Sequence, residues 1–236
     1  MTSTEPAATR PTATDAPDDM AALYPFLYSD TETDLRAVMN QVRESTIAKA
    51  AEIIALRRDI AAHGAEPLIA CALAMAERFA AGARLFVFGN GGSATDAQQV
   101  ATSFLNPREG GALPAISLSS DIAAITALSN DIGFEVVFAR QLAAFGRRAD
   151  IAFALSTSGG SVNLLRALTE AGRIGMLTVG MAAAPGGKMA ELGPVIDHLL
   201  LVPSASVHRV QEAQATIYHN LGTLVRSALS HKEDLP

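Results

Sequence analysis

The fold is decided by one stretch of the chain, Leu85-Phe86-Val87-Phe88-Gly89-Asn90-Gly91-Gly92-Ser93. Its four consecutive apolar residues predict a strand buried on both faces, as in a parallel sheet covered by helices. The glycines that follow allow a sharp turn and a close approach of the backbone to a ligand. From Ser93 to about Phe104 the spacing becomes helical, so the turn presents backbone N–H groups and the Ser93 hydroxyl at a helix N-terminus. Such a terminus binds anions, and we expect it to hold the phosphate of a small molecule.

Strands and helices alternate through the rest of the chain. Further strands are expected at 115–118, 151–155, 175–179 and 195–202. A short helix is expected after the strand 115–118, up to about 129, followed by a break at Asn130-Asp131-Ile132-Gly133. Further helices are expected over 135–145, 162–171, 188–192 and 207–230. This alternation implies right-handed crossovers and an α/β fold of three layers, αβα, around a five-stranded parallel sheet. Ligands bind such sheets at the carboxyl ends of the strands.

A second polar turn, Ser156-Thr157-Ser158-Gly159-Gly160-Ser161, follows the predicted strand 151–155. Its four hydroxyls at the start of a helix suit a dianionic phosphate without Lys or Arg. An ordinary Ser/Thr helix cap would use about one of them. The first turn also fits the looser dinucleotide pattern G-x-G-x-x-A, with Asp121 available for a ribose, but a second phosphate-type turn is not part of that design. No P-loop lysine follows either turn.

The segment before the sheet divides into a tail and two helices. Residues 1–20 are rich in Thr, Ala, Pro and Asp and predict a disordered tail. Residues 21–236 are expected to form a single domain with a helical extension over about 31–81. The two apolar helices of the extension predict packing on the same helices of another subunit, in a dimer or tetramer. Packing on the chain's own sheet is the alternative.

Composition narrows the class of protein. The chain has 236 residues, a net charge of −6 and no basic run, which argues against nucleic-acid binding. Its lone cysteine, Cys71, predicts an inert core thiol. We find no apolar leader and no 18-residue apolar span, so we expect a cytoplasmic protein without a membrane segment.

Four ordered blocks carry a resemblance to a known family. They are Gly89-Asn90-Gly91-Gly92-Ser93 with Asp96-Ala97-Gln98, Leu128-Ser129-Asn130-Asp131-Ile132-Gly133-Phe134, the turn Ser156–Ser161, and Arg209-Val210-Gln211-Glu212. From about Leu35 to its end the chain resembles the SIS (sugar isomerase) domain family, most closely the phosphoheptose isomerase branch that acts on sedoheptulose 7-phosphate. The resemblance implies a flavodoxin-like sheet, N-terminal helices that build a homotetramer, and an aldose–ketose isomerase of carbohydrate metabolism.

The resemblance also implies roles for individual residues. Substrate contacts are implied at Asn90, Gly91, Gly92, Asn130, Asp131 and Gln211, with phosphate on Ser156, Thr157, Ser158 and Ser161. Ser93 joins the substrate-binding set as the hydroxyl of the glycine turn. In the family, the residue matching Gln211 also touches a metal, and the residue matching His219 is a metal ligand that transfers a proton. His219 is therefore the candidate catalytic residue, and a helix histidine packed at an interface is the alternative.

Two positions depart from the family pattern. Gln99 and Ser103 stand where the resemblance implies a zinc-binding His and a Glu that is both ligand and catalytic base. Neither replaces a carboxylate in proton transfer. One Gln with one His is a poor zinc site, so the ligand set is incomplete and a zinc cofactor stays open. Glu212 and His208 are further candidates for the missing group, and a structural role is the alternative for each.

These departures leave three hypotheses about function. The first is a phosphoheptose-type isomerase that works through an altered base set. The second is a non-catalytic SIS protein that senses a sugar phosphate or recruits a protein partner. The third is a mixed oligomer in which a paralogous subunit supplies the missing His and Glu. The expected partners are a small-molecule sugar phosphate and further copies of the chain in a homo-oligomer.

Overall fold

The computed structural model describes residues 35–233 of a chain that divides into two units, 1–49 and 50–236. Helix α3 (Leu35–His63) contains the boundary between them. The predicted tail and the first residues of the predicted extension lie outside the described residues. Within the first unit the apolar side chains of Val38, Met39, Val42 and Ile47 are exposed. None of the described helices is both long enough and apolar enough to span a membrane.

The centre of the second unit is a parallel sheet, as the sequence predicts. Its strands are β1 (Leu85–Gly89), β2 (Ala115–Ser117), β3 (Ile151–Leu155), β4 (Leu177–Ala183) and β5 (His198–Val202). Their order across the sheet is β2-β1-β3-β4-β5, and every neighbouring pair is parallel. The five-stranded flavodoxin-like sheet is thereby confirmed.

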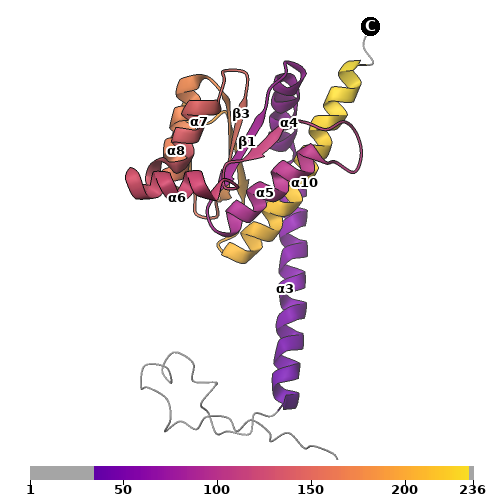
Figure 1. Ribbon diagram of the computed structural model, residues 1–236. Helices are drawn as coiled ribbons and strands as arrows, with labels where there is room; N and C mark the ends of the chain where they lie inside the picture. Colours follow the sequence, from indigo (N-terminus) through magenta and orange to yellow (C-terminus); the bar gives the residue numbers. More distant parts are fainter. Residues whose placement is uncertain (1–34, 234–236) are drawn as a thin grey trace, which may run out of the picture. The chain divides into compact units, whose positions relative to one another are not determined.

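Helices cover both faces of this sheet and make the three layers (Figure 1). One layer consists of α4 (Ala65–Ala80), α5 (Gly92–Leu105) and α10 (Val207–Glu233). The other contains α7 (Val137–Phe145) and α8 (Val162–Ile174), with α6 (Ile122–Asp131) beside α7. Short helical turns complete the chain at η1 (Phe134–Val136), α9 (Gly187–Glu191) and η2 (Gly193–Val195).

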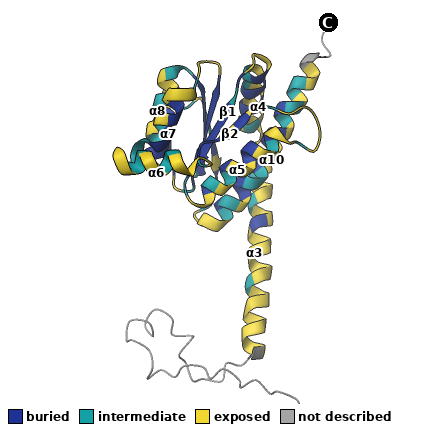
Figure 2. Cartoon of the chain, viewed as in Figure 1, coloured by how far each residue is buried: buried dark blue, intermediate teal, exposed yellow. Residues whose placement is uncertain are grey.

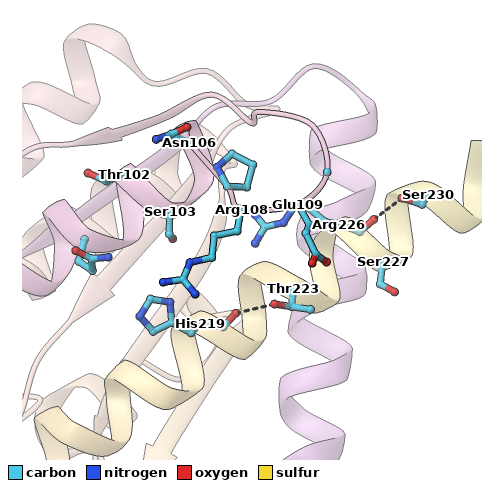
Figure 3. Close-up of a pocket in the computed structure, with 13 residues that line it drawn as sticks. Thr102, Ser103, Asn106, Arg108, Glu109, His219, Thr223, Arg226, Ser227 and Ser230 are labelled. Carbon is cyan, nitrogen blue, oxygen red and sulfur yellow. Dashed lines mark hydrogen bonds between the residues drawn. The ribbon is translucent and has the colours of Figure 1, made fainter.

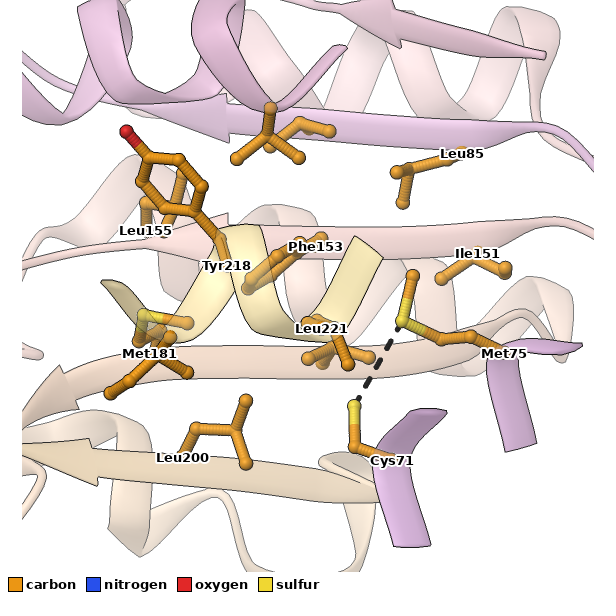
Figure 4. Packing of buried hydrophobic residues seen from close by; sticks show 14 of the residues in the cluster. Cys71, Met75, Leu85, Ile151, Phe153, Leu155, Met181, Leu200, Tyr218 and Leu221 are labelled. Atoms are coloured by element: carbon orange, nitrogen blue, oxygen red, sulfur yellow. Dashed lines mark hydrogen bonds between the residues drawn. The ribbon is translucent and has the colours of Figure 1, made fainter. Parts of the chain in front are cut away.

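Strand β1 supplies both hydrophobic cores because successive side chains point to opposite faces. Leu85 and Val87 join the core under α4, α5 and α10, in which Tyr218 and Leu221 pack over the strands (Figure 4). Phe86 and Phe88 join the core under α7 and α8. Every residue of β1 is buried, as the apolar run predicts (Figure 2). Each such buried side chain stabilises the fold by roughly 1.5–3 kcal/mol relative to exposure.

Cys71 lies fully buried in the first of these cores, on α4. Its Sγ lies 3.9 Å from the Met75 Sδ, and burial raises the pKa of the Cys71 thiol to about 12. The predicted core position of Cys71 is confirmed, and a thiol that resists ionisation is a weak nucleophile.

Strands β4 and β5 differ in their bounds from the sequence-based expectation. Strand β4 begins at Leu177, because Gly175 is the left-handed cap (φ 86°) of α8. The strand continues through Gly180, where a side chain would come within 2.7 Å of the Met189 Sδ. The glycine therefore marks close packing by α9 rather than the end of the strand. Strand β5 begins at His198, after a helical turn, three residues later than expected.

Candidate functional site

The two polar turns lie side by side at one edge of the sheet. Strands β1 and β3 are neighbours, and Gly89 at the end of one pairs with Leu155 at the end of the other. The chain leaves β1 toward β2 on one side and returns to β3 on the other, so this is the point where the strand order reverses. Parallel sheets bind ligands at such a point.

A pair of side-chain amides joins the two turns. The Asn90 Nδ2 donates to the Asn163 Oδ1, and the Asn163 Nδ2 donates to the Asn90 Oδ1, each at 2.8 Å. Asn163 is buried and also accepts a hydrogen bond from the Leu164 N–H at 3.0 Å. The sequence-based reading missed Asn163, because one Asn inside a predicted helix gives no signal of a partner 73 residues away.

The glycine turn has a backbone that side chains would not tolerate. Gly91 has φ 55° and ψ −124°, which L-residues rarely adopt, and it immediately precedes α5. A side chain at Gly89 would come within 2.5 Å of the Ser93 carbonyl oxygen. Ser93 itself is buried beneath the turn. The turn thus exposes backbone at Gly91 and Gly92 to an approaching ligand.

The serine turn is folded by its own hydroxyls. The Gly159 N–H donates to the Ser156 Oγ at 2.9 Å, and the Gly160 N–H donates to the Ser158 Oγ at 3.2 Å. Ser156 is buried, Thr157 is half-buried and Ser158 is exposed. Ser161 is the first residue outside α8, yet its side chain makes no capping hydrogen bond. An ordinary helix cap therefore does not account for the Ser161 hydroxyl.

Helix α10 contacts both turns. The Gln214 Nε2 donates to the Ser156 carbonyl oxygen at 2.7 Å, and Gln214 is fully buried. Gln211, one helical turn earlier, lies so close to Gly92 that a side chain there would overlap its Nε2. The structure therefore brings Gln211 to the glycine turn, 119 residues away in sequence. Gln214 is a residue that the sequence-based reading did not select.

Asn130 and Asp131 lie at the end of α6. Both are exposed, and the Asn130 Nδ2 donates to the Asp131 Oδ1 at 2.9 Å. We expected a break in the chain at these residues, but the helix continues through Asp131 and the chain turns at Gly133 (φ 146°).

His219 lies in a pocket of about 800 Å³ between α5 and α10 (Figure 3). Gln99 and Ser103 line the same pocket, so the structure brings these two positions together with His219. Ser103 donates its hydroxyl to the Val100 carbonyl oxygen at 2.8 Å. The His219 imidazole is exposed and packs against the Tyr218 ring, with centroids 4.8 Å apart.

The carboxylate of Asp96, on α5, lies against α10. The Tyr218 hydroxyl donates to the Asp96 Oδ1 at 3.3 Å, whereas the buried Asp96 Oδ2 has no hydrogen-bond partner. Burial raises the pKa of the Asp96 carboxyl above its ordinary value, and the Tyr218 hydrogen bond offsets part of that rise. Burial, together with the neighbouring carboxylate, raises the pKa of Tyr218 to about 12.

The other candidates for a missing base lie elsewhere. Glu212 forms an ion pair with Arg209, which also pairs with Glu52 at 3.3 Å. The Glu212 carboxylate is therefore paired with a cation, which argues against its acting as the missing base. His208 is exposed at the start of α10.

The residues at this site do not fit zinc. Gln99, Ser103, Gln211 and His219 offer two amides, a hydroxyl and one imidazole, and zinc sites are built from imidazole, thiolate and carboxylate. Over the whole of residues 35–233, no group of three or more His, Cys, Asp or Glu side chains could hold a metal ion. We therefore derive no chemical step through zinc.

Comparison with known proteins agrees with this geometry. Residues 50–183 match the SIS domain family model. A phosphoheptose isomerase of Solidesulfovibrio magneticus is 41% identical over 83% of this chain and 91% of its own length. One from Roseiflexus sp. is 42% identical over 69% of this chain and 82% of its own length.

Solved structures show the same relationship. The phosphoheptose isomerase GmhA of Neisseria gonorrhoeae superposes with a TM-score of 0.74 and 32% identity, over 79% of this chain and 99% of that one. A phosphoheptose isomerase from Francisella tularensis gives a TM-score of 0.69 and 34% identity, over 81% and 97%. The chain belongs to the SIS domain family, in its phosphoheptose isomerase branch.

Proposed function

We propose that this protein binds a sugar phosphate between the glycine and serine turns and is a phosphoheptose-type isomerase with an altered catalytic site. The observation that carries the proposal is the Asn90–Asn163 amide pair, which fixes the two turns against each other at the point where the strand order reverses. The relatives are phosphoheptose isomerases, so a seven-carbon sugar phosphate such as sedoheptulose 7-phosphate is the substrate to test first.

The serine turn binds the phosphate in this proposal. Thr157, Ser158 and Ser161 offer hydroxyls, and the first N–H groups of α8 add the positive end of the helix dipole. Ser156 acts beneath them, because its buried hydroxyl holds the Gly159 N–H. The sugar then lies along the backbone of Gly91 and Gly92, with Gln211 beside it. Asn130 and Asp131, at the exposed end of α6, are further substrate contacts that the proposal keeps.

Isomerisation moves a proton between two carbons of the sugar. A base removes the proton from C1 of the ketose, the C1–H electron pair forms the C1=C2 bond of an enediol, and the former carbonyl oxygen takes up a proton. Return of the proton to C2, with loss of the O1 proton, gives the aldose. His219 is the proposed base, since its neutral imidazole can accept a proton near neutral pH.

A second function follows from Gln99 and Ser103. These side chains line the pocket at the positions of the family's zinc-binding His and its catalytic Glu, and neither is a proton acceptor of carboxylate strength. A protein that binds the sugar phosphate without turning it over, as a sensor or an adaptor, is the alternative that this observation favours.

Oligomeric state belongs to the same proposal. The exposed apolar side chains of α3, among them Met39 and Ile47, are suited to packing on a second copy of the chain. We propose a homo-oligomer, a dimer or tetramer, formed by a single domain over 21–236 in the cytoplasm. Analytical ultracentrifugation tests it, and a monomer at micromolar concentration would contradict it.

One experiment separates the isomerase from the sensor. The protein is incubated in D₂O with sedoheptulose 7-phosphate, and NMR follows replacement of the C1 proton and appearance of the aldose. Exchange that is lost in His219→Gln supports the isomerase. Saturable binding without exchange supports the sensor, and absence of binding overturns both. In the sensor case, the double variant Gln99→His with Ser103→Glu, supplied with zinc, should gain exchange.

A further inference from the structure

The pocket between α5 and α10 extends well beyond His219. Its far end is lined by the loop after α5 and by the last turns of α10 (Figure 3). The lining residues there are Asn106, Pro107, Arg108, Glu109, Gly110, Thr223, Arg226, Ser227 and Ser230. Arg226 lies twelve residues after Gln214, which touches the serine turn, and this is about 18 Å along the helix. The far end is therefore separate from the proposed phosphate position, and we call it the Arg226 site.

The backbone around Arg226 leaves room for its side chain. The guanidinium carbon lies 5.8 Å from the centre of the Phe104 ring, within the range of a cation–π contact. A side chain at Gly222 would come within 3.2 Å of the Arg226 Nη2. A side chain at Gly110, whose φ is +81°, would come within 3.0 Å of the Arg226 Cδ. Glycines on α10 and on the loop thus both make space for this arginine.

One end of the Arg226 guanidinium lacks a partner. Its Nη1 is buried and has no hydrogen-bond partner. Burial also lowers the pKa of Arg226 from its ordinary value. A buried cationic donor without an acceptor costs free energy, because the water that solvated it has been removed and nothing replaces that water. An anion beside the guanidinium would offset this cost by stabilising the buried positive charge.

The charges that face the Arg226 site favour an anion. The Arg108 and Arg226 guanidinium groups both extend into the pocket, and Glu109 contributes one carboxylate on the loop (Figure 3). Two cations against one anion leave a net positive charge. Side-chain hydroxyls of Thr223 and Ser227 line the same space. Guanidinium groups with hydroxyls recognise the oxygens of phosphate or carboxylate.

We propose that the Arg226 site binds a small oxyanion, a phosphate ester or a carboxylate, independently of the sugar phosphate at the two turns. The anion pairs with the Arg226 and Arg108 guanidinium groups, which both line the pocket. The Arg226 site and the proposed base His219 line one pocket. A bound oxyanion would therefore occupy one end of this pocket while His219 lies at the other. This site goes beyond the proposed function and does not depend on it.

The test is a calorimetric titration of the whole chain with inorganic phosphate and, separately, with malonate, in a chloride buffer. The variants are Arg226→Met, Arg226→Lys and a serine-turn variant, Thr157→Val with Ser158→Ala. We expect the serine-turn variant to keep one phosphate site. Arg226→Met should weaken binding at that site by about tenfold or more, and Arg226→Lys by less. Phosphate or malonate affinity that is the same in wild type and Arg226→Met would overturn the proposal.

Thermal unfolding distinguishes loss of the anion site from loss of the fold. In the chloride buffer without phosphate or malonate, Arg226→Met should melt at or above the wild-type temperature, since a buried guanidinium without a partner is removed and the aliphatic stem is retained. Phosphate should raise the wild-type melting temperature and leave that of Arg226→Met less changed. A large loss of stability of Arg226→Met in the same buffer without phosphate or malonate would show that the guanidinium is satisfied within the protein and would contradict the proposal.

Discussion

Asn90 and Asn163 exchange two amide hydrogen bonds of 2.8 Å and join the turn after β1 to the first turn of α8. The pair is out of reach of most solvent, since Asn163 is buried. It fixes the distance between the glycine turn and the serine turn before any ligand arrives. A ligand that contacts both turns therefore does not have to order them. The entropy loss on binding is smaller, and the affinity is correspondingly higher.

Replacement of Asn163 should test this pair. Asn163→Ala leaves the Asn90 amide without its partner, and we expect a loss of roughly 1–3 kcal/mol in unfolding free energy together with weaker sugar-phosphate binding. Urea unfolding and calorimetry measure the two effects. Asn220→Ala is the matched control, because the exposed Asn220 bonds only within α10 and should change neither quantity much. Equal effects of the two variants would contradict the role of the pair.

Gly92 and Gln211 should be coupled. A methyl group at position 92 overlaps the Gln211 Nε2, so Gly92→Ala should displace Gln211 from the glycine turn and weaken substrate binding. Adding Gln211→Ala removes the overlap, and the stability lost in Gly92→Ala should be partly recovered. A double-mutant cycle on unfolding free energy measures the coupling, which should amount to roughly 0.5–3 kcal/mol. Additive effects would show that the two residues do not touch.

Asp96 should make stability depend on pH. Its folded-state pKa is raised, so the folded protein holds this proton more tightly than the unfolded chain. The stability that this provides is complete below the ordinary value of 3.8 and is lost as the pH rises through the folded-state pKa. Asp96→Asn removes the ionisation and should be more stable than wild type at neutral pH, by an amount that shrinks on acidification. Tyr218→Phe, which removes the offsetting hydrogen bond, should strengthen the pH dependence instead.

Phe88 should be a major contributor to stability. It is fully buried at the end of β1 and lies 5.4 Å from Phe138, measured between ring centroids. Phe88→Ala should lower the free energy of unfolding by roughly 3–5 kcal/mol through lost burial and a residual cavity. Phe134→Ala is the control, since the Phe134 ring is about half exposed, and its loss should cost far less. Comparable losses in the two variants would contradict the assigned core.

The sheet could be predicted because its signals are local. Four apolar residues before a glycine turn indicate a buried strand, and the alternation with helices fixes the parallel topology. The end of β4 could not be predicted in this way. A glycine often interrupts a strand, whereas Gly180 lies inside β4 and gives space to Met189 of α9, the helix that follows. The local sequence does not show which side chain packs against the glycine.

The site could be predicted only in part for the same reason. The hydroxyls of the serine turn and the backbone of Gly91 follow from the motif itself. Asn163, Gln214 and Arg226 do not, because each acts on a segment far away in the chain. Their roles depend on how α8 and α10 pack, and packing appears only in three dimensions.

The most direct test of the account is calorimetric titration with sedoheptulose 7-phosphate. We compare wild type with the serine-turn variant Thr157→Val with Ser158→Ala, and with Arg226→Met as the control outside that turn. We expect saturable binding by wild type and by Arg226→Met. In the serine-turn variant the affinity should be lower by about tenfold or more. Undiminished affinity in the serine-turn variant, or no binding by wild type, would contradict it.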